Sequence, residues 1–192
     1  AMILGSSVLL VLLGLGVAAR MGARFSPQAV AIAVIAVIAT VAAGTFDVRT
    51  DATKTLRDSD KVAGGDWGAV FRVDAVEFGD LHVLHHDGLW GSSIWRYDGT
   101  PATTSRFDVD SRQLPFAALG RDPERLLIIG AAGGNEIQAA LTYGVGQIDA
   151  VELNPITVDL LKGKFADYSG NIATRENVNY VQGDGRTFLA RS

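Results

Sequence analysis

The stretch Arg125–Pro155, RLLIIGAAGGNEIQAALTYGVGQIDAVELNP, decides the fold of this 192-residue chain. Its apolar run Leu126–Ile129 predicts a buried parallel strand. Small residues follow, and they allow a sharp backbone turn and the close approach of a ligand. The residues of this turn are Gly130, Ala131, Ala132, Gly133 and Gly134. A helix expected over Asn135–Tyr143 would present its first amide groups to that ligand.

Acidic residues lie at or just after the carboxyl ends of the next two predicted strands, which are expected over Gln147–Leu153 and Val178–Gln182. Glu152 and Leu153 end the second strand, and Glu152 lies 22 residues after Gly130 (152 − 130). A carboxylate at this place accepts hydrogen bonds from ribose hydroxyls in nucleotide-binding folds. Asp184 and Gly185 follow the third strand, where an acid can contact an adenine amino group. We therefore expect a nucleotide-like cofactor at the carboxyl ends of these strands.

Two common phosphate-binding motifs are excluded by the residues of the turn and of the later chain. A dinucleotide fingerprint needs G-x-G-x-x-G, but Ala132 and Asn135 stand at its second and third glycine positions. A P-loop needs Gly-Lys followed by Ser or Thr, whereas Gly163-Lys164 is followed by Phe165. The pattern that remains favours S-adenosylmethionine or a related sulfonium compound.

The region from about Phe71 to Ser192 resembles the spermidine synthase (polyamine aminopropyltransferase) family, in particular its membrane-fused bacterial relatives. The motifs that carry the resemblance are His86-Asp87-Gly88, IIGAAGGNE at 128–136, VELNP at 151–155 and GDGRTFL at 183–189. It implies an α/β fold, in which a small antiparallel β domain precedes a Rossmann-like, S-adenosylmethionine-dependent methyltransferase fold.

The same resemblance implies a cofactor and its contacts. Decarboxylated S-adenosylmethionine would bind in the Gly130–Gly134 turn and on Glu152 and Asp184. His86 and Asp87 would line the site from the β domain. The function implied is a membrane-anchored transferase that passes an aminopropyl or related alkyl group to an amine acceptor, such as a polyamine.

Two departures from the family pattern concern the amine. The interval RYDGTPATTSRFDVDSRQLPFAAL at 96–119 contains no His, although the family carries a Tyr-His-Glu motif there. Gly133 stands where the family has an Asp that faces the aminopropyl amine. Two alternatives therefore stay open, which are methyl transfer from intact S-adenosylmethionine and a non-catalytic, membrane-linked sensor domain that retains the fold.

Only three parallel strands are predicted before the chain ends at Ser192. Three strands leave a long open edge, so we expect a fragment that contains the first half of the methyltransferase fold. The catalytic base of the family follows its fourth strand, so no catalytic residue is assigned here. Enzymatic activity is expected of the full-length protein and not of the fragment.

The N-terminal region has a different composition. Ile3–Ala19 and Gln28–Phe46 contain no charged residue, and as helices they would span roughly 26–28 Å, close to the ~30 Å core of a bilayer. We therefore predict a transmembrane helical hairpin over residues 1–46. More Lys and Arg follow Phe46 than lie in the hairpin loop. This favours a bacterial inner-membrane protein with its soluble domain in the cytoplasm.

The rest of the chain divides by pattern into a linker at 47–66, a small β domain at 67–100, a connection at 101–124 and the partial Rossmann-like domain at 125–192. The β domain contains three histidines, whose spacing does not favour a metal site, and the chain has no cysteine. A net charge of −4 argues against a nucleic-acid partner. The expected partners are the lipid bilayer, further transmembrane helices of the same protein, a small-molecule acceptor and a second copy of the chain in a homodimer.

Overall fold

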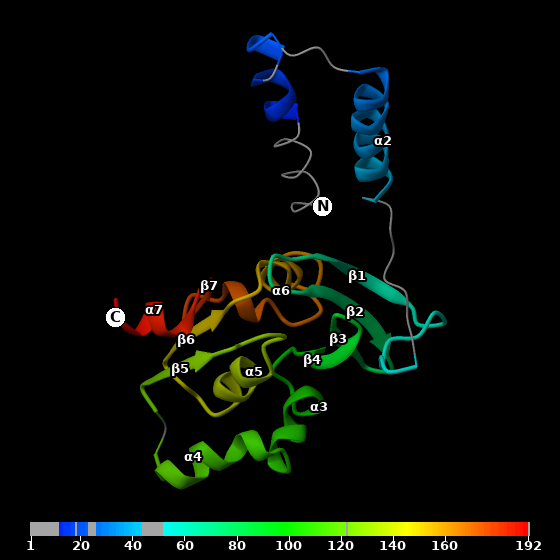
Figure 1. The fold of residues 1–192 in the computed structure, drawn as a ribbon. Helices are drawn as coiled ribbons and strands as arrows, with labels where there is room; N and C mark the ends of the chain where they lie inside the picture. The colour runs from blue at the N-terminus through cyan, green and yellow to red at the C-terminus, as the bar shows by residue number, and fades with distance from the viewer. Residues whose placement is uncertain (1–11, 18, 23–25, 44–51, 122, 192) are drawn as a thin grey trace. The chain divides into compact units, whose positions relative to one another are not determined.

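The computed structural model describes residues 12–17, 19–22, 26–43, 52–121 and 123–191. The chain divides into two compact units, Ala1–Arg49 and Thr50–Ser192. In the first unit, residues 12–17 and 19–20 are helical, and helix α2 covers Pro27–Ala43 (Figure 1).

The predicted transmembrane hairpin is wrong. Within the residues that the structure describes, no helix is long and apolar enough to cross a membrane. Helix α2 has 17 residues, Pro27–Ala43, and the last residues of the expected segment Gln28–Phe46 lie outside the described part of the chain. Most of the first expected helix, Ile3–Ala19, lies outside the described residues. The predicted inner-membrane localisation, with a cytoplasmic soluble domain, was derived from these helices and is contradicted by the same finding.

The second unit begins with a four-stranded antiparallel sheet in the order β1-β2-β3-β4. Its strands are β1 (Val62–Trp67), β2 (Arg72–Phe78), β3 (Leu81–His86) and β4 (Leu89–Trp95). Asp87 and Gly88 join β3 to β4 with φ angles of 49° and 80°. Positive φ at both central residues is the geometry that a tight hairpin requires, and an Asp-Gly pair supplies it.

The segment before β1 packs against this sheet, although its sequence pattern predicts a linker over residues 47–66. The backbone amides of Thr55 and Leu56 both donate to the Gly88 carbonyl at 3.0 Å, and Leu56 is 4 % exposed. Lys61 pairs with Glu77 of β2 at 2.6 Å. The folded unit therefore includes this segment.

A connection of short helices leads from β4 to the second sheet. These are α3 (Pro101–Thr104), the 3₁₀ helices η1 (Ser105–Asp108) and η2 (Ser111–Gln113), and α4 (Leu114–Leu119). Gly120 ends α4 with a φ of 62°, the left-handed conformation that commonly terminates helices.

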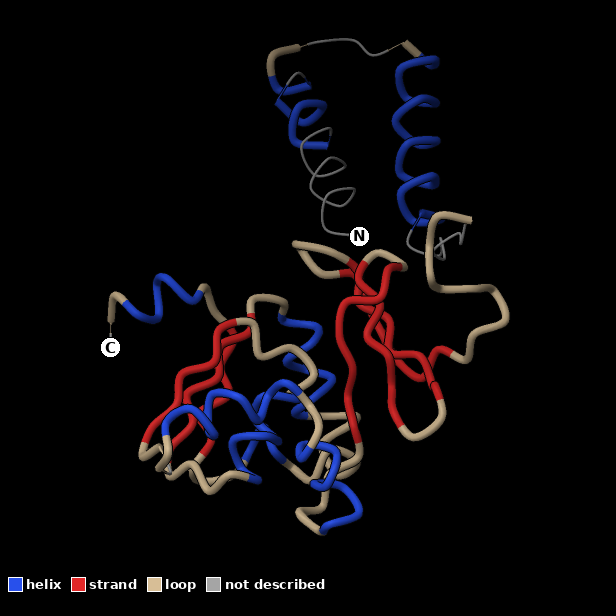
Figure 2. The backbone as a smooth tube through the Cα atoms, turned by 90° about the horizontal axis from the view of Figure 1, so that it is seen from below, coloured by secondary structure: helices blue, strands red, loops and turns tan. Residues whose placement is uncertain are grey.

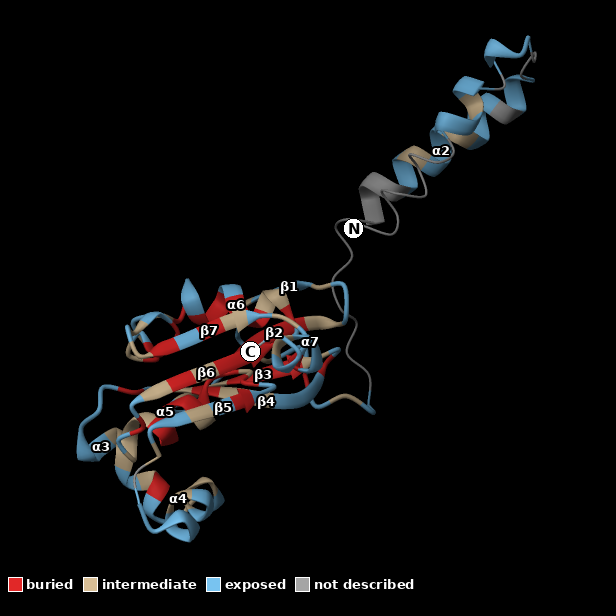
Figure 3. Ribbon diagram, turned by 90° about the vertical axis from the view of Figure 1, so that its left-hand side faces the viewer, coloured by how far each residue is buried: buried red, intermediate tan, exposed pale blue. Residues whose placement is uncertain are grey.

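The second sheet is parallel, with the strand order β5-β6-β7. Its elements are β5 (Arg125–Ile129), α5 (Asn135–Thr142), β6 (Gln147–Glu152), α6 (Pro155–Lys162), η3 (Ile172–Thr174), β7 (Val178–Gln182) and α7 (Gly185–Leu189). The apolar residues of the central strand β6 are the most buried, because β6 has a strand on each side (Figure 3). The predicted α/β architecture is confirmed for this part.

Helices α5 and α6 lie between the two sheets (Figure 2). Helix α5 contacts β4 on one side and β5 and β6 on the other, while α6 contacts β1 and the strands β6 and β7. Side chains from both sheets and both helices form one apolar core. Its members include Val73, Leu84 and Ile94 of the antiparallel sheet, Ile137 of α5, Leu161 of α6, and Ile148 and Tyr180 of the parallel sheet. The two sheets are therefore one packing unit.

Candidate functional site

The candidate site lies at the carboxyl edge of the parallel sheet, where the segments that follow β5, β6 and β7 meet. Open α/β sheets bind their ligands at this edge. The turn after β5 and the turn after β7 both attach to β6 by backbone hydrogen bonds. The Gly130 and Ala131 amides donate to the Val151 carbonyl at 2.8 and 3.1 Å, and the Gly183 amide donates to the Glu152 carbonyl at 2.8 Å.

The turn after β5 is held in a tight conformation. Gly130, Ala132 and Gly134 have φ angles of 79°, 42° and 83°. The Gly134 amide donates to the Ala131 carbonyl at 2.8 Å, and Gly134 caps the start of α5. At Gly130 a methyl group would have no heavy atom within 4 Å outside its chain neighbours. The turn is therefore open at Gly130.

Glu152 is joined directly to this turn. Its Oε2 accepts a hydrogen bond from the Ala132 amide at 2.9 Å, and its Oε1 accepts one from the Asn154 amide at 2.7 Å. The side chain is buried. Because a carboxylate oxygen has two lone pairs, each oxygen retains one acceptor position after these bonds. The structure thus brings together two of the predicted site elements, the turn and the acid.

Two residues outside the predicted set support this arrangement. Asn154 caps α6 through a hydrogen bond from the Ile156 amide to its Oδ1 at 2.9 Å, and its Nδ2 donates to the Phe71 carbonyl at 3.2 Å. An Asn before a helix that starts with Pro is a local capping signal that the sequence contains. The Tyr180 hydroxyl donates to the Ala132 carbonyl at 2.9 Å. Burial raises the pKa of this hydroxyl, so it stays protonated and acts as a donor.

Asp184 lies beyond β7 and caps the short helix α7. Its Oδ1 accepts hydrogen bonds from the amide and the hydroxyl of Thr187 at 2.9 and 3.1 Å. These bonds lower the pKa of the carboxyl group, which keeps it ionised. The Cα of Gly185 packs closely on Ile129, because an added methyl group would lie 2.5 Å from its Cγ2. Asp184 also lines a surface depression of about 310 Å³ with Val181, Gln182, Gly183, Thr187, Phe188 and Arg191.

The remaining predicted residues separate into two groups. The rings of His86 and Phe71 stack with their centroids 4.3 Å apart. Burial lowers the pKa of the His86 imidazole, and the negative charge of Glu152 opposes this shift. Asp87 is exposed in the β3–β4 hairpin, where its Oδ1 accepts from the Arg72 amide at 2.9 Å. Leu153 is 49 % exposed. His86 is therefore near enough to Glu152 for the two groups to interact electrostatically. Asp87 instead has a structural role in its own turn.

The antiparallel sheet approaches the turn at Gly133. A methyl group at this residue would lie 2.0 Å from the Ser93 carbonyl oxygen and 2.6 Å from its carbon. The side chain of the next helix residue, Asn135, donates to the same carbonyl at 2.9 Å. The position that carries an Asp in the resembled family is thus in contact with the backbone of β4. The part of the chain that is described contains no group of three or more His, Cys, Asp or Glu residues suited to a metal ion.

Comparison with known proteins supports the same fold. No model of a protein family matches the chain. A stretch of 68 residues, 35 % of the chain, is 28 % identical to a polyamine aminopropyltransferase of Korarchaeum cryptofilum (strain OPF8) and covers 21 % of it. The chain therefore spans about a fifth of the curated relative that it matches.

Among solved structures, the chain is similar to the spermidine synthase of Thermotoga maritima, with a TM-score of 0.51 and 16 % identity over 68 % of this chain and 44 % of that one. A spermidine synthase in complex with the transition-state analogue AdoDATO gives a TM-score of 0.49 and 16 % identity, over 68 % of this chain and 43 % of that one. The first likeness establishes the fold. The expected resemblance to the spermidine synthase-like family is confirmed.

Proposed function

We propose that this chain provides the cofactor-binding part of a spermidine synthase-like transferase, which binds an S-adenosylmethionine-type cofactor and transfers an aminopropyl or related alkyl group to a small amine. One observation carries the proposal, which is the 2.9 Å hydrogen bond from the Ala132 amide to Glu152. It places a carboxylate beside an open glycine turn at the carboxyl edge of a parallel sheet. The aminopropyltransferase relative supports the choice of reaction class.

The residues present fit an adenosyl ligand. The open backbone at Gly130 leaves room for a ligand to approach the turn closely. Glu152 offers its remaining lone pairs to the two ribose hydroxyls, as acids do at this place in nucleotide-binding folds. Asp184 is ionised and exposed, so it suits the amino group of an adenine ring.

When bound, the cofactor supplies a carbon next to a sulfonium, which an amine attacks as the carbon–sulfur bond breaks and its electron pair returns to sulfur. The contribution of this chain is to orient the donor, and alignment of the reacting atoms lowers the barrier. Tyr180 and Asn154 hold the turn and Glu152 in place by the hydrogen bonds described above. The proton that leaves the attacking amine needs a base, and no described residue is assigned this role.

Substitution of Glu152 tests the proposal. In Glu152→Gln, a neutral amide replaces the charged acceptor, so the affinity for S-adenosylmethionine and its decarboxylated form should fall by about 1.5–3 kcal/mol, the range for hydrogen bonds to charged groups. Isothermal titration calorimetry measures this change. Asp149→Asn is the matched control, because it removes the same charge from the same strand and Asp149 pairs with Arg125 away from the turn. Equal affinities of wild type and Glu152→Gln would remove Glu152 from the site.

Methyl transfer from intact S-adenosylmethionine is a second candidate, and the contact at Gly133 favours it. The amine of the decarboxylated cofactor calls for an acidic partner, and the Ser93 carbonyl leaves no space for a side chain at position 133. The two candidates differ in the ligand that binds more tightly. Preference for the decarboxylated form in the same titrations supports aminopropyl transfer, and preference for the intact form supports methyl transfer.

A further inference from the structure

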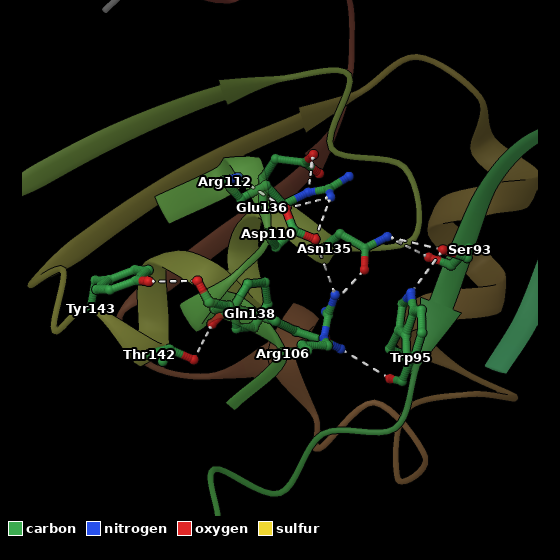
Figure 4. Close-up of polar contacts among 11 residues, drawn as sticks. Ser93, Trp95, Arg106, Asp110, Arg112, Asn135, Glu136, Gln138, Thr142 and Tyr143 are labelled. Carbon is green, nitrogen blue, oxygen red and sulfur yellow. Dashed lines mark hydrogen bonds and ion pairs between the residues drawn. The ribbon is translucent and has the colours of Figure 1, made fainter. Parts of the chain in front are cut away.

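We propose that Arg106 is a positioning residue for the cofactor turn, because its guanidinium orients two amide side chains that attach the start of α5 to the edge of β4 (Figure 4). Arg106 lies in η1, far from the motifs that predicted the site. The inference rests on the proposed function, because it takes the turn that this attachment supports to be the cofactor site.

The outer edge of β4 needs hydrogen-bond partners. In the described sheet β4 pairs only with β3, so the carbonyl groups on its other side face away from any strand. Ser93 and Trp95 are two residues apart, and their carbonyls therefore point to the same side. A buried carbonyl without a partner is costly, so this edge must be satisfied from elsewhere in the fold.

Two amide side chains of α5 satisfy it. Asn135 Nδ2 donates to the Ser93 carbonyl at 2.9 Å, and Gln138 Nε2 donates to the Trp95 carbonyl at 3.0 Å. Asn135 and Gln138 are three residues apart on a helix and share one face. Both are buried, Gln138 completely. They take the place that a neighbouring strand would occupy.

Arg106 fixes the direction of both amides. One nitrogen, Nη2, donates to Asn135 Oδ1 at 3.0 Å and to Gln138 Oε1 at 2.6 Å. Because an amide has its donor and acceptor at opposite ends, holding both oxygens on Arg106 directs both nitrogens to β4. Charge-assisted bonds of this kind are stronger than neutral ones.

The surroundings of Arg106 hold the guanidinium at this junction. Its Cζ lies 4.8 Å from the ring centre of Trp95 and 4.0 Å from that of Phe107. Burial lowers its pKa to about 10, so the group is still charged at neutral pH. Its Nε is buried without a hydrogen-bond partner among the described residues, and the nearest acid, Asp110, is 4.0 Å away. The contacts to the two amides are therefore its strongest.

The junction reaches the cofactor turn through two neighbouring residues. Asn135 directly follows Gly134, and the Ser93 carbonyl that Asn135 contacts also packs on Gly133. Movement of the amides would therefore loosen Gly133 and Gly134 before it affected the parallel sheet. This local effect distinguishes a positioning role from a general contribution to stability.

Amide hydrogen exchange measured by NMR on the full chain tests the inference without a ligand. The variant Arg106→Met keeps the aliphatic stem and removes the guanidinium. We expect exchange at the Gly134 and Gln138 amides to increase about tenfold relative to that at the Ile148 amide in β6. Affinity for S-adenosylmethionine should fall by a similar factor, about tenfold. An equal change at all three amides, or none, would overturn the inference.

Two further variants complete the experiment. Arg125→Met is the control, because it also removes a paired guanidinium, but Arg125 pairs with Asp149 of β6 and not with α5; we expect exchange at the Gly134 and Gln138 amides to stay within about twofold of wild type. Arg106→Lys retains the charge without the planar fork, so its increase in exchange at the Gly134 and Gln138 amides should be intermediate. If the methionine variant does not fold, the lysine variant decides whether Arg106 positions the turn. If the wild-type chain binds no adenosyl ligand, the proposed function fails while the exchange measurement still decides the role of Arg106.

Discussion

At the scale of single residues, Gly133 shows how a missing side chain is explained by its surroundings. In sequence it is an unexplained departure from the resembled family, which has an acid there. In the structure its Cα lies against the Ser93 carbonyl, so that any side chain would collide with the backbone of β4. The glycine is therefore required by packing between the two sheets.

Alanine at position 133 should destabilise the protein. The added methyl group must displace β4 or the turn, and such overpacking costs about 1–3 kcal/mol. Urea unfolding measures the loss. Gly183→Ala is the control, because there the methyl group would meet only Val151 Cγ1 at an ordinary 3.7 Å and the φ is not positive. Similar free energies of unfolding for the two variants would contradict the close contact.

At the scale of elements, the segment before β1 is a structural part of the antiparallel sheet. Its residues are mostly polar and of mixed charge, which is why the sequence pattern resembles a linker. Leu56 carries the packing, since it is 4 % exposed and its amide reaches the Gly88 carbonyl of the β3–β4 turn. A single apolar residue gives no periodic pattern in the sequence. Its burial can therefore be recognised only in the folded sheet.

Truncation of Leu56 tests this attachment. Leu56→Ala should lower the free energy of unfolding by about 2–4 kcal/mol, in the range for buried leucines. Leu114→Ala on α4, where the side chain is 62 % exposed, should change it by less than about 0.5 kcal/mol. Chemical denaturation of both variants supplies the comparison. A small loss at Leu56, equal to that at Leu114, would return the segment to the status of a linker.

At the scale of the whole molecule, three histidines of β3 make stability depend on pH. Burial lowers the pKa values of His82, His85 and His86, and nearby acids oppose the shift only partly. One ring nitrogen of each is buried without a partner among the described residues. The folded state therefore binds protons less readily than the unfolded state, in which the histidine pKa is about 6.5.

It follows that the stabilising effect of the neutral rings is complete above about pH 6.5 and is lost as the pH falls further. Urea midpoints should be equal at pH 8 and 7 and should fall between pH 6.5 and 5. The acids with lowered pKa values lose their contribution only near pH 4 and below, which separates the two effects. In His82→Phe, whose ring would keep the tilted contact with Phe165 and the edge-on contact with Tyr168 that the imidazole makes, the decline should be smaller. A midpoint at pH 5 equal to that at pH 8 would be inconsistent with buried neutral histidines.

The parallel strands and the glycine turn follow from short-range pattern alone. The expected strands at 126–129, 147–153 and 178–182 correspond to β5, β6 and β7 within one residue at each end. A short apolar run bounded by small residues is typical of a buried parallel strand. The long apolar segments at the N-terminus predicted membrane helices by the same reasoning, and that prediction is wrong, since no helix among the described residues is long and apolar enough to cross a membrane.

The contacts that shape the candidate site join residues far apart in the chain, and only folding brings them together. Asn135 and Ser93 are 42 positions apart, Asn154 and Phe71 are 83 apart, and Arg106 reaches Gln138 across 32. None of these pairs has a periodic signal, since each depends on how the antiparallel sheet packs against α5 and α6. Local sequence was enough to place the turn and Glu152 at the edge of a sheet. The packing of the two sheets decided which residues hold them there, because hydrogen bonds between distant segments form only where tertiary structure brings donor and acceptor within about 3 Å.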